Sequence, residues 1–207
     1  MNPVDTVPAE IAAELRKTGR LAEARWCPSP NFGPRPPGAN ISLLVVHNIS
    51  LPPGQFGGPA IEQFFCNRLD PAEHPYFATI ASQQVSAHIL VRRDGQCVQF
   101  VSLLDRAWHA GRSSHDGRPE CNDYSIGIEL EGTDHDPYTP EQYRGLARVS
   151  RQIMTAWPDI TIDRLTGHSD IAPGRKTDPG PAFDWARYRR LLAGNHSVSA
   201  GAGGWPG

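Results

Sequence analysis

The sequence predicts a single α/β domain in which helices flank a central mixed β-sheet. The first observation behind this prediction is the length of 207 residues, which suits one domain with a sizeable core. The second is that short apolar or alternating runs, typical of strands, share the chain with longer runs of helical periodicity. The third is the dipeptide Asp94-Gly95 between two strand-like runs, which indicates a β-hairpin.

The N-terminal part combines a polar lead with a buried strand. Ile11, Leu15 and Leu21 stand among charged residues and predict an amphipathic helix over residues 10–21, which either docks on the domain or frays. Residues 41–47 then form a short apolar run, β-branched towards its end, which is typical of a buried strand.

Loops rich in proline and glycine bound this strand, over residues 28–40 and 50–59. A short helix is expected over residues 59–69, and the hairpin follows over residues 85–101. Residues 125–131 alternate between apolar and other side chains, as a strand with one buried face does.

Two helices are expected in the C-terminal third. Thr139 suits an N-cap, Pro140 the first helical position and Gln142 the capping-box position, so a helix should begin here and end before Pro158. Aromatic and aliphatic residues spaced three and four apart predict a second helix over residues 183–192.

Composition excludes several classes of protein. With a formal net charge of −2, the chain lacks the positive electrostatic field that is typical of a general nucleic-acid-binding protein. No apolar run is long enough to span a bilayer, and the first residues do not resemble a secretory signal, so we expect a cytoplasmic protein without a membrane partner. The four cysteines show no C-x-x-C spacing and are expected to be free, buried thiols.

Two histidines stand in unusual positions. His47 ends the first predicted strand, where a side chain leaves the core and can enter a cleft. His168 opens a polar, turn-rich segment that also carries Lys176 and Asp178. Two imidazoles and one carboxylate suit a catalytic zinc ion (Zn²⁺), which keeps one position for water. The alternative is that these residues are structural, because the spacing alone is a weak signal.

Several other side chains have both a catalytic and a structural interpretation. Glu129 could be a general base, but Glu131 lies on the same strand face, and either could simply face solvent. Lys176 could stabilise an oxyanion or be an ordinary loop cation. Trp108 could pack on a sugar ring or belong to the core, while Asn122 could bond the polar groups of a sugar.

Five ordered blocks of the sequence form a joint pattern. They are Leu-Leu-Val-Val-His47-Asn48, Val-Ser-Ala-His88, Ala-Trp108-His-Ala-Gly, Cys-Asn-Asp-Tyr-Ser-Ile-Gly-Ile-Glu129 and Gly-His168-Ser-Asp-Ile-Ala-Pro-Gly-Arg-Lys176-Thr-Asp178. Together they resemble the AmpD family of cytoplasmic anhydro-N-acetylmuramyl-L-alanine amidases, which act in cell-wall recycling. The resemblance runs from about residue 24 to residue 192.

The resemblance implies the zinc-dependent amidase type 2 fold, which peptidoglycan recognition proteins share. It also implies a role for each matching residue. These are zinc ligation by His47, His168 and Asp178, catalysis by Glu129 and Lys176, and substrate binding by Asn48, Trp108 and Asn122.

Three positions depart from the pattern that the resemblance implies. Phage-type relatives carry a tyrosine where this chain has Ala87, so the resemblance moves that role to Glu129. The family carries basic residues where this chain has Gln84 and Glu120. If those basic groups hold stem-peptide carboxylates, the peptide preference of this chain differs.

The resemblance therefore predicts hydrolysis of the amide between the lactyl group of (anhydro)muramic acid and L-Ala, with a small muropeptide as the partner and no obligate protein partner. The expected division is an N-terminal extension over residues 1–23, an amidase domain over 24–192 and a disordered Gly-rich tail over 193–207. Two alternatives remain at this point. One is a zinc-free muropeptide-binding module on the same fold, and the other is a zinc peptidase that acts on ordinary peptides.

Overall fold

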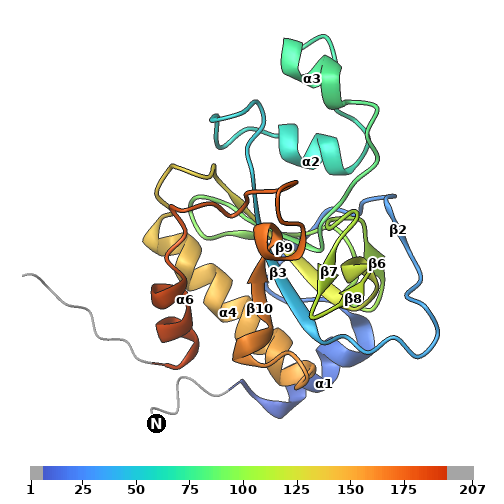
Figure 1. Cartoon of the computed structure of the whole chain (residues 1–207), viewed down its shortest axis with the longest axis vertical. Helices are drawn as coiled ribbons and strands as arrows, with labels where there is room; N and C mark the ends of the chain where they lie inside the picture. The colour runs from blue at the N-terminus through green and yellow to red at the C-terminus, as the bar shows by residue number, and fades with distance from the viewer. Residues whose placement is uncertain (1–6, 195–207) are drawn as a thin grey trace, which may run out of the picture.

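The computed structural model describes residues 7–194 of the chain (Figure 1). Its helices are α1 Ala9–Thr18, α2 Ala60–Phe65, α3 Pro75–Ile80, α4 Pro140–Ala156, α5 His168–Ile171 and α6 Trp185–Leu192, with 3-10 turns at Cys121–Asp123 and Ile162–Arg164. Its strands are β1 Arg25–Trp26, β2 Phe32–Gly33, β3 Leu43–Ile49, β4 Ile89–Val91, β5 Cys97–Gln99, β6 Arg106–Ala107, β7 Ser114–His115, β8 Arg118–Pro119, β9 Ser125–Glu131 and β10 Leu165–Gly167.

A six-stranded sheet in the order β1-β5-β4-β9-β3-β10 forms the centre of the molecule. Strands β4 and β5 pair antiparallel, and the other neighbours in the sheet pair parallel. Two small antiparallel pairs, β2-β6 and β7-β8, lie outside it. The predicted α/β class with a mixed central sheet is therefore confirmed.

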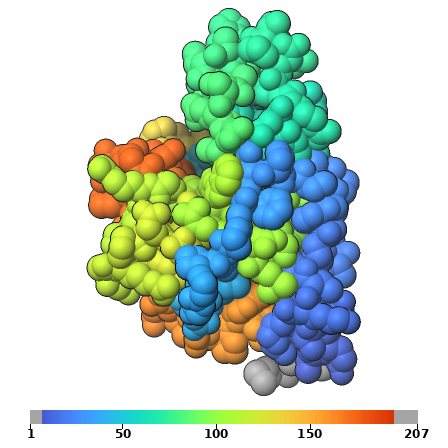
Figure 2. Space-filling model, turned by 90° about the vertical axis from the view of Figure 1, so that its right-hand side faces the viewer, coloured from blue at the N-terminus to red at the C-terminus, as the bar shows by residue number. Residues whose placement is uncertain are grey.

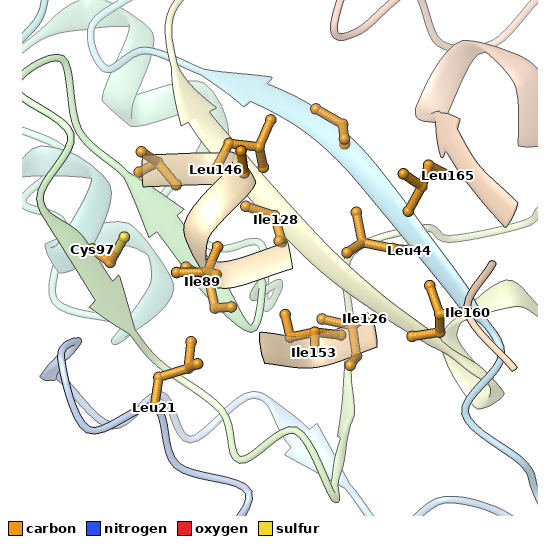
Figure 3. Close-up of a cluster of buried hydrophobic side chains, with 14 of the residues drawn as sticks. Leu21, Leu44, Ile89, Cys97, Ile126, Ile128, Leu146, Ile153, Ile160 and Leu165 are labelled. Atoms are coloured by element: carbon orange, nitrogen blue, oxygen red, sulfur yellow. The ribbon is translucent and has the colours of Figure 1, made fainter. Parts of the chain in front are cut away.

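One face of the sheet carries the main core under α4. The alternation of β9 sends Ile126 and Ile128 to this face, where Leu146 and Ile153 of α4 pack over them (Figure 3). The same alternation sends Glu129, and the residues two positions before and after it, to the opposite face. The alternation of β9 thus places apolar side chains in the main core and the carboxylates on the other face of the sheet.

The opposite face is covered by a second apolar cluster. Leu90 and Val98 from the sheet join Phe64 and Phe65 of α2 there. The long connection between β3 and β4, which carries α2 and α3, projects beyond the body of the molecule in two perpendicular views (Figures 1 and 2). We call residues 50–88 the arm.

Helix α1 docks on the body and does not fray. Leu15 is only 2% exposed and belongs to the main core, which includes residues of α4. The Gln99 side chain accepts from the Leu21 backbone N–H at 2.9 Å and donates to the Gly19 carbonyl at 2.7 Å. These contacts tie the end of α1 to the sheet.

Most predicted elements are present with shifted ends. The strand expected over 41–47 is β3, two residues later, and the strand over 125–131 is β9 with the same bounds. The capping box of α4 is confirmed, since the Thr139 hydroxyl accepts from Gln142 N–H and the Gln142 side chain accepts from Thr139 N–H.

The predictions for the cysteines and the tail have different outcomes. All four cysteines are free, and Cys66 is only partly buried, contrary to the expectation that all four are buried. The Gly-rich tail predicted over 193–207 lies, from residue 195 onward, outside the described residues. Within residues 7–194, every helix is too short or too polar to cross a membrane.

Candidate metal and catalytic site

Three adjacent parallel strands bring the predicted site residues to one edge of the sheet. His47 of β3 and Glu129 of β9 are direct partners in the strand register. On the other side of β3, Gly167 of β10 pairs with Val46, so His168 follows at the level of His47. Side chains that leave the carboxyl ends of neighbouring parallel strands meet in one crevice. The topology therefore places both histidines beside Glu129.

The two histidines and Asp178 aim three ligand atoms at one point. His47 Nδ1, His168 Nδ1 and Asp178 Oδ2 lie 3.0 Å from one another in all three pairs. A tetrahedral zinc ion with bonds of about 2.0–2.2 Å separates its ligand atoms by roughly 3.3–3.6 Å. The three atoms are within about half an ångström of that separation, so the donor set fits such an ion.

Hydrogen bonds behind the imidazoles leave the inward nitrogens available. The far nitrogen of His168, Nε2, lies 3.1 Å from the Ala110 carbonyl oxygen, which can only accept. Nε2 therefore carries the proton in neutral His168, and Nδ1 presents its lone pair to the centre. His47 Nε2 lies 2.9 Å from His109 Nδ1, so the second imidazole is also held from behind.

The charge states of the site also suit a cation. Burial lowers the pKa of His47 to about 4, so this imidazole is neutral at pH 7. Burial would raise the pKa of Asp178, but the close polar contacts of its Oδ2 with His168 and His47, each at 3.0 Å, outweigh burial and hold the pKa of this carboxyl below its usual range. The site thus combines an ionised carboxylate with a neutral imidazole, which are the forms that bind metal.

Glu129 and Glu131 have different environments although they share one face of β9. Glu129 is 9% exposed, lines the cavity, and its buried Oε2 has no hydrogen-bond partner within the described part of the chain. Burial first, and the charge of Asp178 second, raise the pKa of Glu129 well above its usual value. Glu129 is therefore the carboxyl that is free to exchange a proton.

Glu131 serves the architecture of the arm. It is 1% exposed and accepts hydrogen bonds from the backbone N–H groups of Gly57 at 2.6 Å and Arg93 at 3.2 Å. Arg92 lies 3.6 Å from the same carboxylate. The two glutamates, which the strand pattern does not distinguish, thus differ in their hydrogen-bond partners.

A cavity of about 770 Å³ lies in front of these groups. Glu129, His168, Lys176 and Asp178 are among the residues that line it. Lys176 is exposed there, and its ammonium group has no partner among residues 7–194, although its charge acts on Glu129 and His47. Such a cation is available to a substrate oxygen.

The three residues expected to bind substrate all line the same cavity. Asn48 donates to Asp134 Oδ1 at 2.8 Å, and Trp108 is half-buried at the wall. Asn122 is more deeply placed, and its Oδ1 accepts from the backbone N–H groups of His109 and Ala110. The oxygen of Asn122 is therefore already engaged within the protein.

The departures from the family pattern lie in different places. Gln84 lines the cavity, whereas Glu120 is not part of its wall. The Glu120 side chain is 56% exposed and forms an ion pair of 3.5 Å with Arg106. Of these two positions, Gln84 is the one that can contact a molecule bound in the cavity.

The cavity also has residues that the sequence interpretation did not single out. Tyr76 and Gln83 of the arm form part of its wall, with Arg175 on the side of the metal ligands. The Arg175 guanidinium donates to the carbonyl oxygens of Ala110 and Arg112 at 2.6 and 2.7 Å. His109 could have been noticed in the sequence because it directly follows Trp108. No pattern in the sequence marks Tyr76 as a cavity residue.

Comparison with known proteins gives a consistent family. The family model for N-acetylmuramoyl-L-alanine amidase matches residues 37–181. The chain is 60% identical over 178 residues to the 1,6-anhydro-N-acetylmuramyl-L-alanine amidase AmpD of Citrobacter freundii, covering 86% of this chain and 95% of the relative.

Solved structures agree with this result. A crystal structure of selenomethionine-substituted AmpD superposes with a TM-score of 0.82 at 60% identity, covering 84% of this chain and 97% of the other. The Escherichia coli amidase AmiD, in complex with the substrate anhydro-N-acetylmuramic acid-L-Ala-D-gamma-Glu-L-Lys, gives a TM-score of 0.55 at 29% identity, covering 75% and 60%. These matches confirm the fold and the resemblance read from the sequence.

Proposed function

Because this chain belongs to the family of N-acetylmuramoyl-L-alanine amidases, we propose that it is a zinc-dependent amidase of peptidoglycan recycling. The bond it hydrolyses is the amide between the lactyl group of 1,6-anhydro-muramic acid and L-Ala. The observation that carries the zinc proposal is the convergence of His47, His168 and Asp178 on one point beside Glu129, whose Oε2 has no hydrogen-bond partner within residues 7–194. AmiD, a relative with the same fold, is solved with an anhydro-muropeptide substrate.

The chemistry divides between the metal and the protein. A bound zinc ion polarises the scissile carbonyl and lowers the pKa of a water molecule. His47, His168 and Asp178 would hold it, since their donor atoms have the spacing and charge that zinc requires. All other steps fall to side chains that line the cavity.

Glu129 is the proposed general base and acid. Its raised pKa suits a carboxyl that takes a proton from the attacking water and returns it to the nitrogen of the leaving L-Ala. Its register pairing with His47 supports this role, because it sets Glu129 beside a proposed metal ligand. No hydrogen bond in the described part of the chain competes for Oε2.

Lys176 and the cavity wall supply the remaining interactions. The ammonium group of Lys176, which has no partner in the described range 7–194, stabilises the negative charge that develops on the carbonyl oxygen in the transition state. Trp108 presents a half-buried ring to a sugar face, and Asn48 and Asn122 offer amide groups to its polar substituents.

We also propose a cellular compartment and an active region for the enzyme. We place the enzyme in the cytoplasm, where free thiols such as those of its four cysteines persist. The active region is residues 24–192, and the substrate is a small muropeptide, with no requirement for a protein partner.

Asp178→Ala tests the metal site. We expect the parent to purify with close to one zinc ion per chain by elemental analysis, and the variant to lose both stoichiometric zinc and activity. Asp163→Ala is the matched control, because Asp163 is exposed on a 3-10 turn and its side chain forms no hydrogen bond or ion pair in the described structure. Full zinc content in Asp178→Ala would remove Asp178 from the ligand set.

Product analysis tests the reaction. Mass spectrometry should show that the parent releases the stem peptide from an anhydro-muropeptide and leaves the free stem peptide intact. Cleavage within the free peptide would indicate an ordinary zinc peptidase, and binding without cleavage would indicate a recognition module.

A further inference from the structure

A single dipeptide lies behind both histidine ligands. His109 Nδ1 is 2.9 Å from His47 Nε2, and the carbonyl oxygen of the next residue, Ala110, is 3.1 Å from His168 Nε2. We propose that His109 and Ala110 set the orientation and the proton position of both imidazoles, and that Asn122 holds this dipeptide in place. The inference rests on the proposed zinc function, because the orientation matters only if the imidazoles bind a metal.

The direction of the hydrogen bonds supports a positioning role for His109. His109 Nε2 lies 3.1 Å from the Ser125 hydroxyl, which can donate or accept. If His109 Nε2–H donates to Ser125, its Nδ1 accepts from His47 Nε2–H, and the inward Nδ1 of His47 is bare. The opposite direction would put a proton on the atom that must bind the metal. Only the first arrangement prepares His47 as a ligand.

The ring of His109 has little freedom to move. A Cβ atom placed on Gly127 would come within 2.4 Å of the His109 ring, so the ring lies directly on the bare backbone of β9. Its centroid is 5.0 Å from that of His47, with the two planes at 82°. Glycine at position 127 thus creates the space in which His109 reaches His47.

Asn122 fixes the backbone of the same dipeptide. Its Oδ1 accepts from His109 N–H at 3.1 Å and from Ala110 N–H at 2.8 Å, and its side chain is almost fully buried. The Ala110 carbonyl also accepts from Arg175, which restrains the dipeptide from the cavity side. A displacement of residues 109–110 would therefore disturb both imidazole ligands together.

The test compares zinc affinity among variants, measured by competition with a chromophoric chelator. His109→Leu removes the acceptor behind His47 and should weaken zinc binding about 10- to 100-fold, the usual effect of losing such a partner. His109→Gln keeps an acceptor oxygen and should recover most of the affinity. Zinc binding by His109→Leu within threefold of the parent would overturn the inference.

His88→Gln is the matched control for loss of a buried histidine. His88 is fully buried close to His109, but it bonds Gly127 N–H and the Asp105 carbonyl and makes no hydrogen bond with a proposed ligand. This variant should lose thermal stability and keep zinc affinity within about threefold. If His88→Gln loses as much zinc affinity as His109→Leu, general destabilisation explains the loss in both variants, and the inference is overturned.

Two further measurements keep the test decisive if His109→Leu does not fold. Asn122→Leu should weaken zinc binding. Asn122→Asp keeps the acceptor oxygen and should therefore bind zinc more tightly than Asn122→Leu. Equal zinc affinities of the two variants would contradict the proposal that Asn122 holds the dipeptide in place. In the zinc-loaded parent, ¹⁵N shifts of His47 should show the proton on Nε2, and a proton on Nδ1 would overturn the arrangement. A parent that binds no zinc would instead refute the proposed function itself.

Discussion

Glu129 and Glu131 show how strongly local surroundings divide the roles of identical side chains. They stand two residues apart on the same face of β9. Glu129 has a buried oxygen without a hydrogen-bond partner among residues 7–194, a raised pKa and a place on the cavity wall. Glu131 accepts hydrogen bonds from two backbone N–H groups, that of Gly57 in the arm and that of Arg93 after β4. The difference arises from the chain segments that pack against each residue, which no local pattern encodes.

Glu129→Gln and Glu131→Gln should therefore fail in different ways. We expect Glu129→Gln to keep zinc and fold normally while kcat falls by about 10²–10⁴, the usual contribution of a general base. Glu131→Gln should lose roughly 2–3 kcal/mol of unfolding free energy, because it weakens buried charge-assisted hydrogen bonds. Steady-state kinetics, zinc content and urea unfolding distinguish the two, and similar behaviour of both variants would contradict the assignment.

At the residue scale, the sequence predicted the groups of the site but not all of their neighbours. His47, His168 and Asp178 could be nominated because their residue types and their family blocks suit a metal. His109 lies in the block Ala-Trp108-His-Ala-Gly, but the sequence assigned it no role. Its function depends on a contact with His47 that only the folded chain creates. The same holds for Tyr76, which reaches the cavity from the arm.

At the scale of elements, strong local signals predicted best. The alternation of β9 and the capping box of α4 both depend on nearby residues and were located correctly. Short β10 and α5 were missed, although β10 leads directly into His168, the first residue of α5. Elements of three or four residues have too few side chains for a period to show. Tertiary pairing with β3, not local preference, makes β10 a strand.

The docking of α1 gives a prediction at this scale. Leu15 is 2% exposed in the main core, whereas Ile11 on the same helix is 42% exposed. Leu15→Ala should cost about 2–5 kcal/mol of unfolding free energy, as other buried leucines do. Ile11→Ala should change it by no more than roughly 0.5 kcal/mol. Equal, small effects in urea unfolding would mean that the helix contributes little to the stability of the domain.

At the scale of the whole molecule, ionic contacts join the arm to the sheet. Glu62 of α2 bonds Arg25 of β1 and Arg92, which follows β4, each at 2.5 Å. Burial would raise the pKa of Glu62, but the hydrogen bonds from the two arginines outweigh it and lower the pKa. A carboxyl whose pKa falls on folding stabilises the folded state when it is ionised.

This ionic link predicts a pH dependence. Because the folded pKa lies below the ordinary value of 4.5, the stabilising effect is complete above about pH 4.5 and is lost as pH falls through the folded pKa. The parent should exceed Glu62→Gln by about 1 kcal/mol in the free energy of urea unfolding at pH 7, and this difference should narrow as the pH falls below 4.5, for example at pH 3. A gap that is unchanged at pH 3 would show that the carboxylate charge is not the source.

The arm has a consequence for how this enzyme can change. Its residues Tyr76 and Gln83 line the cavity, and its helix α2 packs in the second apolar cluster. His47 and Glu129, in contrast, stand on β3 and β9, whose apolar side chains belong to the main core. Natural selection can thus exchange side chains on the arm and retune which glycopeptides are accepted, while descendants inherit the reactive centre unaltered.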